Sequence, residues 1–215
     1  MDQKLPAPVD AVALRHVLVS SSAGTLALLS LRRRVALADG RDAEARALED
    51  ARKRILVLAR SQLRRANHII SGPSEVADTL NEAVSIATGI SPDDFGDRIT
   101  LTGPSLIVPD KSTSPLYLLI HELTSQMWEN VRDEAGKPHL TLQWDPAQNA
   151  DLIPGLSLVI ASAGVHRSSE LIEDTSTSYA DEVINSASQQ LAATVSHRQD
   201  SGRSVCEIFI PGDFG

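Results

Sequence analysis

The first long segment of the chain carries the hydrophobic spacing of a packed helix. Residues 9–36 follow two prolines and contain no helix-breaking residue except Gly24. Small and apolar residues recur along the segment at alternating steps of four and three, at Leu14, Leu18, Ser21, Thr25 and Leu28. This spacing is typical of the seam of a helix pair or bundle.

A second long helix is predicted over residues 43–70, after a turn at 38–42 with a glycine and a capping aspartate. One face of it is apolar or small, with Leu48, Ala51, Ile55, Leu58, Ala59, Gln62, Ala66 and Ile69. A short turn between two long amphipathic helices predicts an antiparallel hairpin. Since a lone hairpin cannot cover both sides of its apolar stripe, we expect two chains to pair into a four-helix bundle. The alternative is that the hairpin packs against the rest of its own chain.

The pattern changes after Gly72-Pro73, which ends the second helix. Ser74 is placed to cap a third helix, whose apolar positions are Val76, Leu80, Ala83, Val84 and Ala87. We therefore divide the chain into residues 1–72, a helical hairpin, and residues 73–215, a second domain.

The second domain alternates between strand and helix patterns. Strand-like alternation is found at residues 99–102, 105–108, 139–144, 156–161 and 204–210. Helices are predicted at about 114–131 and 178–193. Together these elements predict an α+β layer in which one mixed or antiparallel sheet carries helices on one face.

Composition and charge exclude several classes of protein. The net charge of −8 argues against nucleic acid, whose phosphates require a basic face. The single cysteine, Cys206, excludes an internal disulfide and a cysteine-rich zinc site, and fits a reducing cytoplasm. No apolar run reaches the length of a membrane span. We expect a soluble, cytoplasmic protein with no membrane or nucleic-acid partner.

Several short motifs resemble those of sensor histidine kinases. His16 is followed twelve and thirteen positions later by Leu28-Leu29, and His121-Glu122-Leu123 matches a His-Glu-Leu signature. Further matching runs are residues 54–61, 140–144 and 206–211. In this order they resemble the HWE subgroup and the related second class of histidine-kinase dimerisation domains. The resemblance implies a dimeric helical hairpin followed by a histidine-kinase ATPase-like α/β sandwich, over nearly the whole chain.

The same comparison shows departures in the elements that serve ATP. The family's metal-chelating asparagine is Gln126 here, and a longer amide misplaces its oxygen for Mg²⁺, which demands near-ideal geometry. The run 160–164, where the family has an adenine-binding carboxylate, contains none. The glycine-rich lid is also missing, since no glycine occurs between Gly164 and Gly202.

That lid segment is poor in cations as well as in glycine. The stretch from Ser168 to Ser178 offers hydroxyls, but its acids Glu170, Glu173 and Asp174 would repel a triphosphate, which Arg167 alone offsets little. We therefore expect no productive ATP binding, no cofactor and no metal ion.

His16 is the candidate phosphoacceptor. It lies about 200° around the helix from Leu14, and therefore away from the apolar seam. A neutral imidazole can accept a phosphoryl group on nitrogen, and Arg15 beside it is a candidate contact for the phosphoryl oxygens. The family's basic residue, Lys and Asn after this histidine are Val17, Val19 and Ser20 here. The alternative is that His16 is a solvated surface histidine left over from a kinase ancestor.

The remaining candidates have simpler explanations. His121 and Glu122 could suggest a general acid/base pair or two metal ligands. The signal is weak, because no third ligand stands at a suitable spacing. Trp128 and Trp144 are core or pocket-filling residues. The basic run 32–34 is compatible with the C-terminal end of a helix. A solvated face explains it more simply than attraction to the acidic pocket of a receiver domain. The other histidines, His68, His139, His166 and His197, show no metal-site spacing.

The sequence therefore supports a primary hypothesis and two alternatives. The first is a histidine phosphotransfer protein that passes a phosphoryl group between the aspartates of response-regulator receiver domains through His16, without ATP. The second is a non-catalytic pseudokinase that binds and regulates a response regulator or a histidine kinase. The third is an active kinase with an unusual pocket.

Overall fold

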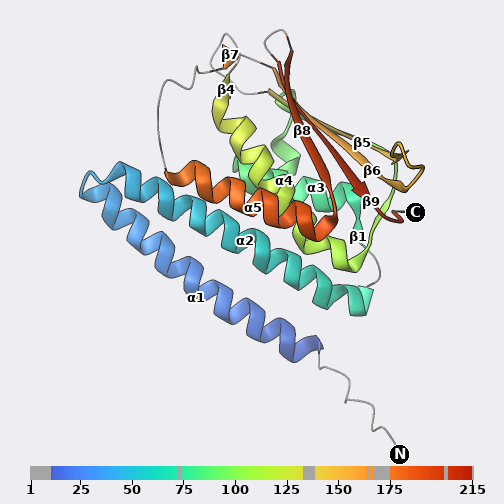
Figure 1. The fold of residues 1–215 in the computed structure, drawn as a ribbon. Helices are drawn as coiled ribbons and strands as arrows, with labels where there is room; N and C mark the ends of the chain where they lie inside the picture. Colours follow the sequence, from blue (N-terminus) through green and yellow to red (C-terminus); the bar gives the residue numbers. More distant parts are fainter. Residues whose placement is uncertain are drawn as a thin grey trace, which may run out of the picture. The chain divides into compact units, whose positions relative to one another are not determined.

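The computed structural model describes residues 11–71, 74–132, 139–163, 165–166, 175–200 and 203–214. The chain divides into two compact units, Met1–Gly72 and Pro73–Gly215 (Figure 1). None of the described helices is both long enough and apolar enough to cross a bilayer.

The first unit is a hairpin of two long helices, α1 (Ala11–Ala38) and α2 (Asp42–Ser71). The turn between them depends on Gly40, which has a φ of 72° in the left-handed region that glycine adopts without a steric penalty. The Gly40 N–H donates to the carbonyl of Leu37, and the Arg41 N–H to that of Ala36. These bonds satisfy carbonyls at the end of α1, so the hairpin predicted from the sequence is confirmed.

The side of α1 that the chain itself covers differs from the predicted seam. Leu26 and Leu29 are half-buried and Ala36 is fully buried, whereas Thr25 and Leu28 are exposed, Leu28 by 64%. The other predicted seam positions, 14, 18 and 21, have side chains outside the described set. The hairpin contact is therefore rotated around α1 from the predicted stripe, and the described part of that stripe faces outward.

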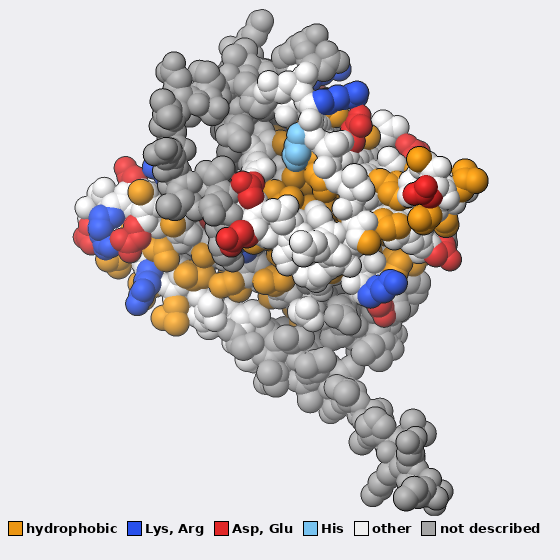
Figure 2. Space-filling model, in the orientation of Figure 1, with side chains coloured by type: hydrophobic (Ala, Val, Ile, Leu, Met, Phe, Trp, Pro, Cys, Tyr) orange, Lys and Arg blue, Asp and Glu red, His pale blue; other side chains and the backbone are white. Residues whose placement is uncertain are grey.

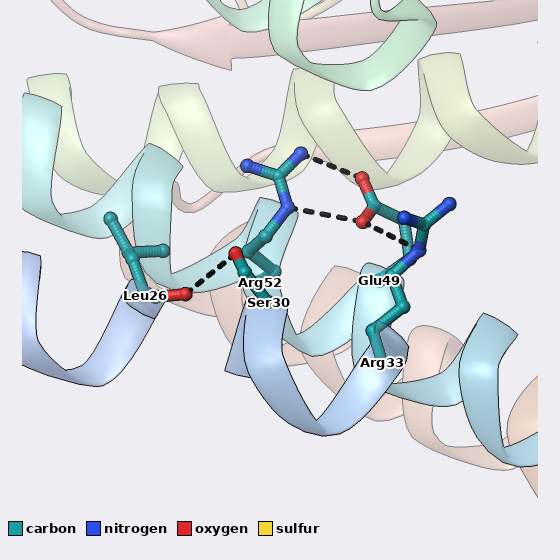
Figure 3. Close-up of polar contacts among 5 residues, drawn as sticks. All are labelled: Leu26, Ser30, Arg33, Glu49 and Arg52. Atoms are coloured by element: carbon teal, nitrogen blue, oxygen red, sulfur yellow. Dashed lines mark hydrogen bonds and ion pairs between the residues drawn. The ribbon is translucent and has the colours of Figure 1, made fainter. Parts of the chain in front are cut away.

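A group of charged side chains joins the two helices of the hairpin (Figure 3). Arg52 donates to both oxygens of Glu49 on the same helix, at 3.1 and 2.6 Å. Arg33 of α1 lies 3.3 Å from the same carboxylate. The hydrogen bond from Arg52, with the charge of Arg33 beside it, holds the pKa of Glu49 below its ordinary value. One arginine of the basic run 32–34 thus ties α1 to α2.

The second unit is built on a mixed five-stranded sheet in the order β2-β5-β6-β9-β8. The strands are β2 (Ile99–Thr102), β5 (His139–Gln148), β6 (Pro154–Ala163), β8 (Thr194–Asp200) and β9 (Arg203–Pro211). β2 runs parallel to β5, and the other pairs are antiparallel. The helices α3 (Val76–Thr88), α4 (Asp110–Asn130) and α5 (Thr175–Leu191) cover one face (Figure 1). The predicted α+β class is confirmed.

The core of this unit lies between the sheet and its helices. Residues in register across the strands point to one face of the sheet. Leu142, Ile160 and Cys206 are in register in this way, and all three are fully buried. From the helix layer come equally buried side chains, including Leu80, Leu116, Leu119, Ile120 and Leu123. Aliphatic residues therefore fill the core, as expected of a chain with 3% aromatic residues.

The segment around the first helix of the second unit corrects two predictions. Ser74 does not cap α3; it lies with Glu75 in β1 (Ser74–Glu75), and Glu75 is the N-cap without a side-chain bond. The strand expected at 105–108 is only β3 (Ile107–Val108), and it pairs with β1 rather than with the main sheet. Residues 107–108 thus form a separate two-stranded sheet with β1, and they do not add a strand to the main sheet.

α4 begins at Asp110, before the expected start at about 114, and contains Pro115. Pro115 is the sixth residue of the helix, beyond the first four whose N–H groups lack intrahelical acceptors, so its missing N–H removes one intrahelical hydrogen bond. Three short elements were not expected: η1 (Pro92–Asp94), and β4 (Val131–Arg132) paired with β7 (Val165–His166).

Candidate functional site

The His-Glu-Leu signature lies in the middle of α4, with its polar pair buried. The Nδ1 atom of His121 lies 3.2 Å from Oε1 of Glu122, and each side chain is 2% exposed. Among the described residues, Nε2 of His121 has no hydrogen-bond partner. The pair is closed to a substrate in this structure, which fits a structural role better than independent acid/base chemistry.

Further along α4, Gln126 lies in a groove rather than in the core. The groove has a volume of about 460 Å³ and is formed by α4, α5 and β8. α5 contributes Asp181 and Asn185, and β8 contributes His197. His197 also approaches Cys206 of β9, with Nε2 and Sγ 3.9 Å apart. Among the described residues that line the groove, Asp181 is the only one with a permanent charge.

The end of β6 is where the family resemblance implies an adenine contact. Ile160 and Ser162 point toward the helix layer and are 0% and 1% exposed. The Ser162 hydroxyl has no partner among the described residues. No carboxylate lies in the described run 160–163, so the sequence difference noted there is retained in the fold.

Several sequence-based candidates lie outside the described side chains. The backbone of His16 and Arg15 is helical within α1, but their side chains are not described. Gly164 and residues 167–174, which hold Arg167 and most of the expected lid, are also outside the described residues. The phosphoacceptor and lid assignments therefore remain predictions.

The two tryptophans have local structural roles. Trp144 is 3% exposed, and its Nε1 donates to the carbonyl of Pro104 at 2.8 Å. The guanidinium of Arg98 lies 4.9 Å from the centre of the Trp128 ring, a cation–π distance. Trp144 is thus a core residue, and Trp128 joins α4 to the start of β2.

The other histidines do not form a metal site in the described structure. His139 contacts the carbonyl of Asp97 through Nδ1 at 3.1 Å. Within the described ranges, no three His, Cys, Asp or Glu side chains gather closely enough to hold a metal ion.

Sequence reasoning missed the α5 and β8 side of the groove. Asp181, Asn185 and His197 belong to no motif, and β8 shows no apolar alternation in the sequence Thr194–Asp200. Only the position of β8 beside β9 brings His197 near α5. A polar segment directly after a helix of an α/β layer was the one available signal.

Comparison with known proteins identifies the fold. No family model matches the chain, and no curated protein matches it. The chain is similar to the blue-light activated histidine kinase EL346 of Erythrobacter litoralis, with 12% identity, a TM-score of 0.59, and coverage of 97% of this chain and 62% of that one. The separate histidine kinase domain of EL346 matches with 14% identity, a TM-score of 0.50, and coverage of 95% and 94%. The present chain thus spans less than two thirds of the longer kinase, and it has a histidine-kinase-like fold.

Proposed function

We propose that this chain is a histidine phosphotransfer protein of a two-component phosphorelay that carries the phosphoryl group on His16. The observation that carries the proposal is the histidine-kinase-like fold over nearly the whole chain, with a histidine early in its first helix. In the transfer, an imidazole nitrogen attacks the phosphorus of an aspartyl phosphate, and the aspartate carboxylate leaves. The reverse reaction delivers the group to a second aspartate, with Mg²⁺ supplied by the receiver domain.

The groove beside Gln126 supports the absence of ATP from this chemistry. Its described lining brings the carboxylate of Asp181 and no lysine or arginine, which is a poor fit to a triphosphate. Neighbouring His121 and Glu122 are turned toward each other at 2% exposure. A magnesium-ATP titration should therefore leave the melting temperature unchanged, because only a ligand that binds the folded state raises it. A clear rise in the melting temperature would contradict this and favour an active kinase.

The test of the phosphotransfer proposal uses phosphorylated receiver domains from the same genome. Wild-type chain should take up acid-labile label from at least one receiver, and His16→Ala should take up none. Ala23→Ser, at an exposed position two turns further along α1, is the matched control and should label as wild type does.

Binding without labelling would favour the second candidate, a non-catalytic pseudokinase. Val17, Val19 and Ser20, at positions where the family has a basic residue, Lys and Asn, favour that candidate. In that case the second unit selects the partner, and His16 has no chemical role.

We also propose that two chains pair through the hairpin. Three aliphatic side chains of α1, Leu28, Leu31 and Val35, are 64, 59 and 48% exposed and follow i, i+3, i+7 spacing along one stripe. Such a stripe on two hairpins forms the seam of a four-helix bundle. Light scattering should report a dimer for wild type and a monomer for Leu31→Glu. Ala23→Glu, exposed on another side of α1, should remain dimeric. A monomeric wild type at micromolar concentration would contradict the proposal.

A further inference from the structure

β8 forms an edge of the main sheet. In the described structure it pairs with β9 alone, while the sheet continues on the other side of β9. In an antiparallel pair, alternate residues direct N–H and C=O away from the partner strand. β8 therefore presents unpaired backbone donors and acceptors along its outer side, and residues 196–199 are all exposed. It contains no proline that would interrupt pairing with another strand.

The groove described above runs beside this edge. The side chains of Val195 and His197 point from β8 into it, and Ile184 and Asn185 face them from α5. The Ser188 hydroxyl is buried at its margin, with no partner among the described residues. In Figure 2, hydrophobic side chains reach the surface between the pale-blue histidine and nearby acidic side chains. An open strand edge and a groove for side chains therefore occur together.

These two features together have the geometry to fit an extended polypeptide. A strand added along β8 forms backbone hydrogen bonds with the edge, and every second side chain of the added strand points toward the helix layer. The groove then decides which side chains fit. Ile184 and Val195 suit an aliphatic side chain, and Asp181, with the amide oxygens of Asn185 and Gln126, suits a lysine or arginine.

We propose that the β8–α5 groove binds an extended basic segment of a partner protein by strand addition to β8. The net charge of the chain, −8, attracts such a segment, and Asp181 fixes a cationic side chain within the groove. This site does not depend on phosphotransfer through His16. It gives the second unit a way to select a partner by a short linear sequence.

The test uses a fluorescein-labelled decapeptide in which serine occupies every second position and lysine and valine alternate between the serines, so that lysine and valine side chains share one face of the strand. The readout is the fluorescence anisotropy of this peptide as the full chain is added. Asp181→Lys should weaken binding by about fivefold or more, because it replaces an ion pair by a repulsion. Glu182→Lys makes the same charge change at an exposed neighbouring position that does not line the groove, and should weaken binding by less than about twofold.

A second probe separates strand addition from attraction between charges. The same decapeptide N-methylated at every residue keeps its side chains and charge but loses the backbone donors of both edges, and its affinity should fall by about tenfold or more. With the unmodified peptide, amide hydrogen exchange should slow at alternate residues of Thr194–Asp200.

Four results would each overturn the proposal. They are no binding of the lysine–valine peptide at millimolar concentration, equal binding of the N-methylated peptide, equal effects of the two charge reversals, and exchange protection only outside β8 and α5. Concentration-dependent protection of β8 without peptide would assign the edge to a second copy of the chain instead.

Discussion

Replacing His121 by leucine should destabilise the second unit by about 3 kcal/mol, because it leaves the Glu122 carboxylate in the core without its imidazole. Leaving a buried polar group without its hydrogen-bond partner costs about 1–3 kcal/mol, and more when that group is charged. Glu122 keeps a further interaction besides His121, so the cost should stay near about 3 kcal/mol. Each side chain is 2% exposed, so water does not replace the lost partner.

The double variant His121→Leu/Glu122→Met separates a structural pair from two independent contributions. It removes both polar groups and keeps apolar volume, so its cost should be within about 1 kcal/mol of wild type. Glu122→Met alone leaves the imidazole unpaired and should cost about 2 kcal/mol. The coupling free energy in this cycle is then about 4 kcal/mol or more.

Urea unfolding monitored by tryptophan fluorescence measures this cycle, since Trp128 and Trp144 both lie in the second unit. Thr124→Val is the matched control, because its buried hydroxyl has no partner among the described residues and its loss should be neutral or stabilising. A coupling free energy near zero, or a His121→Leu variant as stable as wild type, would refute the reasoning.

Three further predictions concern packing, thiol chemistry and a turn. Gly103→Ala should lower the free energy of unfolding in urea by about 2 kcal/mol, because the added Cβ overlaps the side chain and backbone of Trp144. At Gly24 an added Cβ meets nothing within 4 Å, so Gly24→Ala should stabilise α1 by about 0.5–1 kcal/mol, measured by circular dichroism. Burial raises the pKa of Cys206 to about 12, so iodoacetamide at pH 8 should alkylate only unfolded chain. As pH rises, the thiol ionises in the unfolded chain before it does in the folded chain. The free energy of unfolding should therefore fall as pH rises above about 9. Rapid alkylation of folded chain would contradict this. Leu152→Asn should stabilise the fold by about 0.5–1 kcal/mol in thermal melts, because Leu152 is 74% exposed with a φ of 61°; a loss of stability would contradict it.

The long helices and the buried strands were predictable because their side chains repeat with the period of the element. The hairpin, the α+β class and the histidine-kinase-like fold followed from such patterns and from short motifs. Local geometry was less predictable. Ser74 resembled a cap, but pairing of β1 with β3 took its backbone into a strand. The start of α4 was placed at about 114, whereas the helix begins at Asp110 and continues through Pro115, its sixth residue.

The sequence by itself determined which faces of the long elements are apolar, since burial of those faces drives folding whatever their partner. It also predicted His16 as the phosphoacceptor, and Gln126 and the glycine-poor lid as departures from the elements that serve ATP. It did not determine which side of α1 the chain covers, because several apolar stripes run along that helix. Only the tertiary structure decided that Thr25 and Leu28 stay exposed.

The tertiary structure alone also decided the groove. β8 is a polar edge strand, and its formation depends on backbone pairing with β9 rather than on hydrophobic alternation in its own sequence. Asp181, Asn185 and His197 are distant from Gln126 along the chain, and no periodicity links them. They meet because α5 leads directly into β8 at the sheet edge, so the physical origin of this site is topology rather than local pattern.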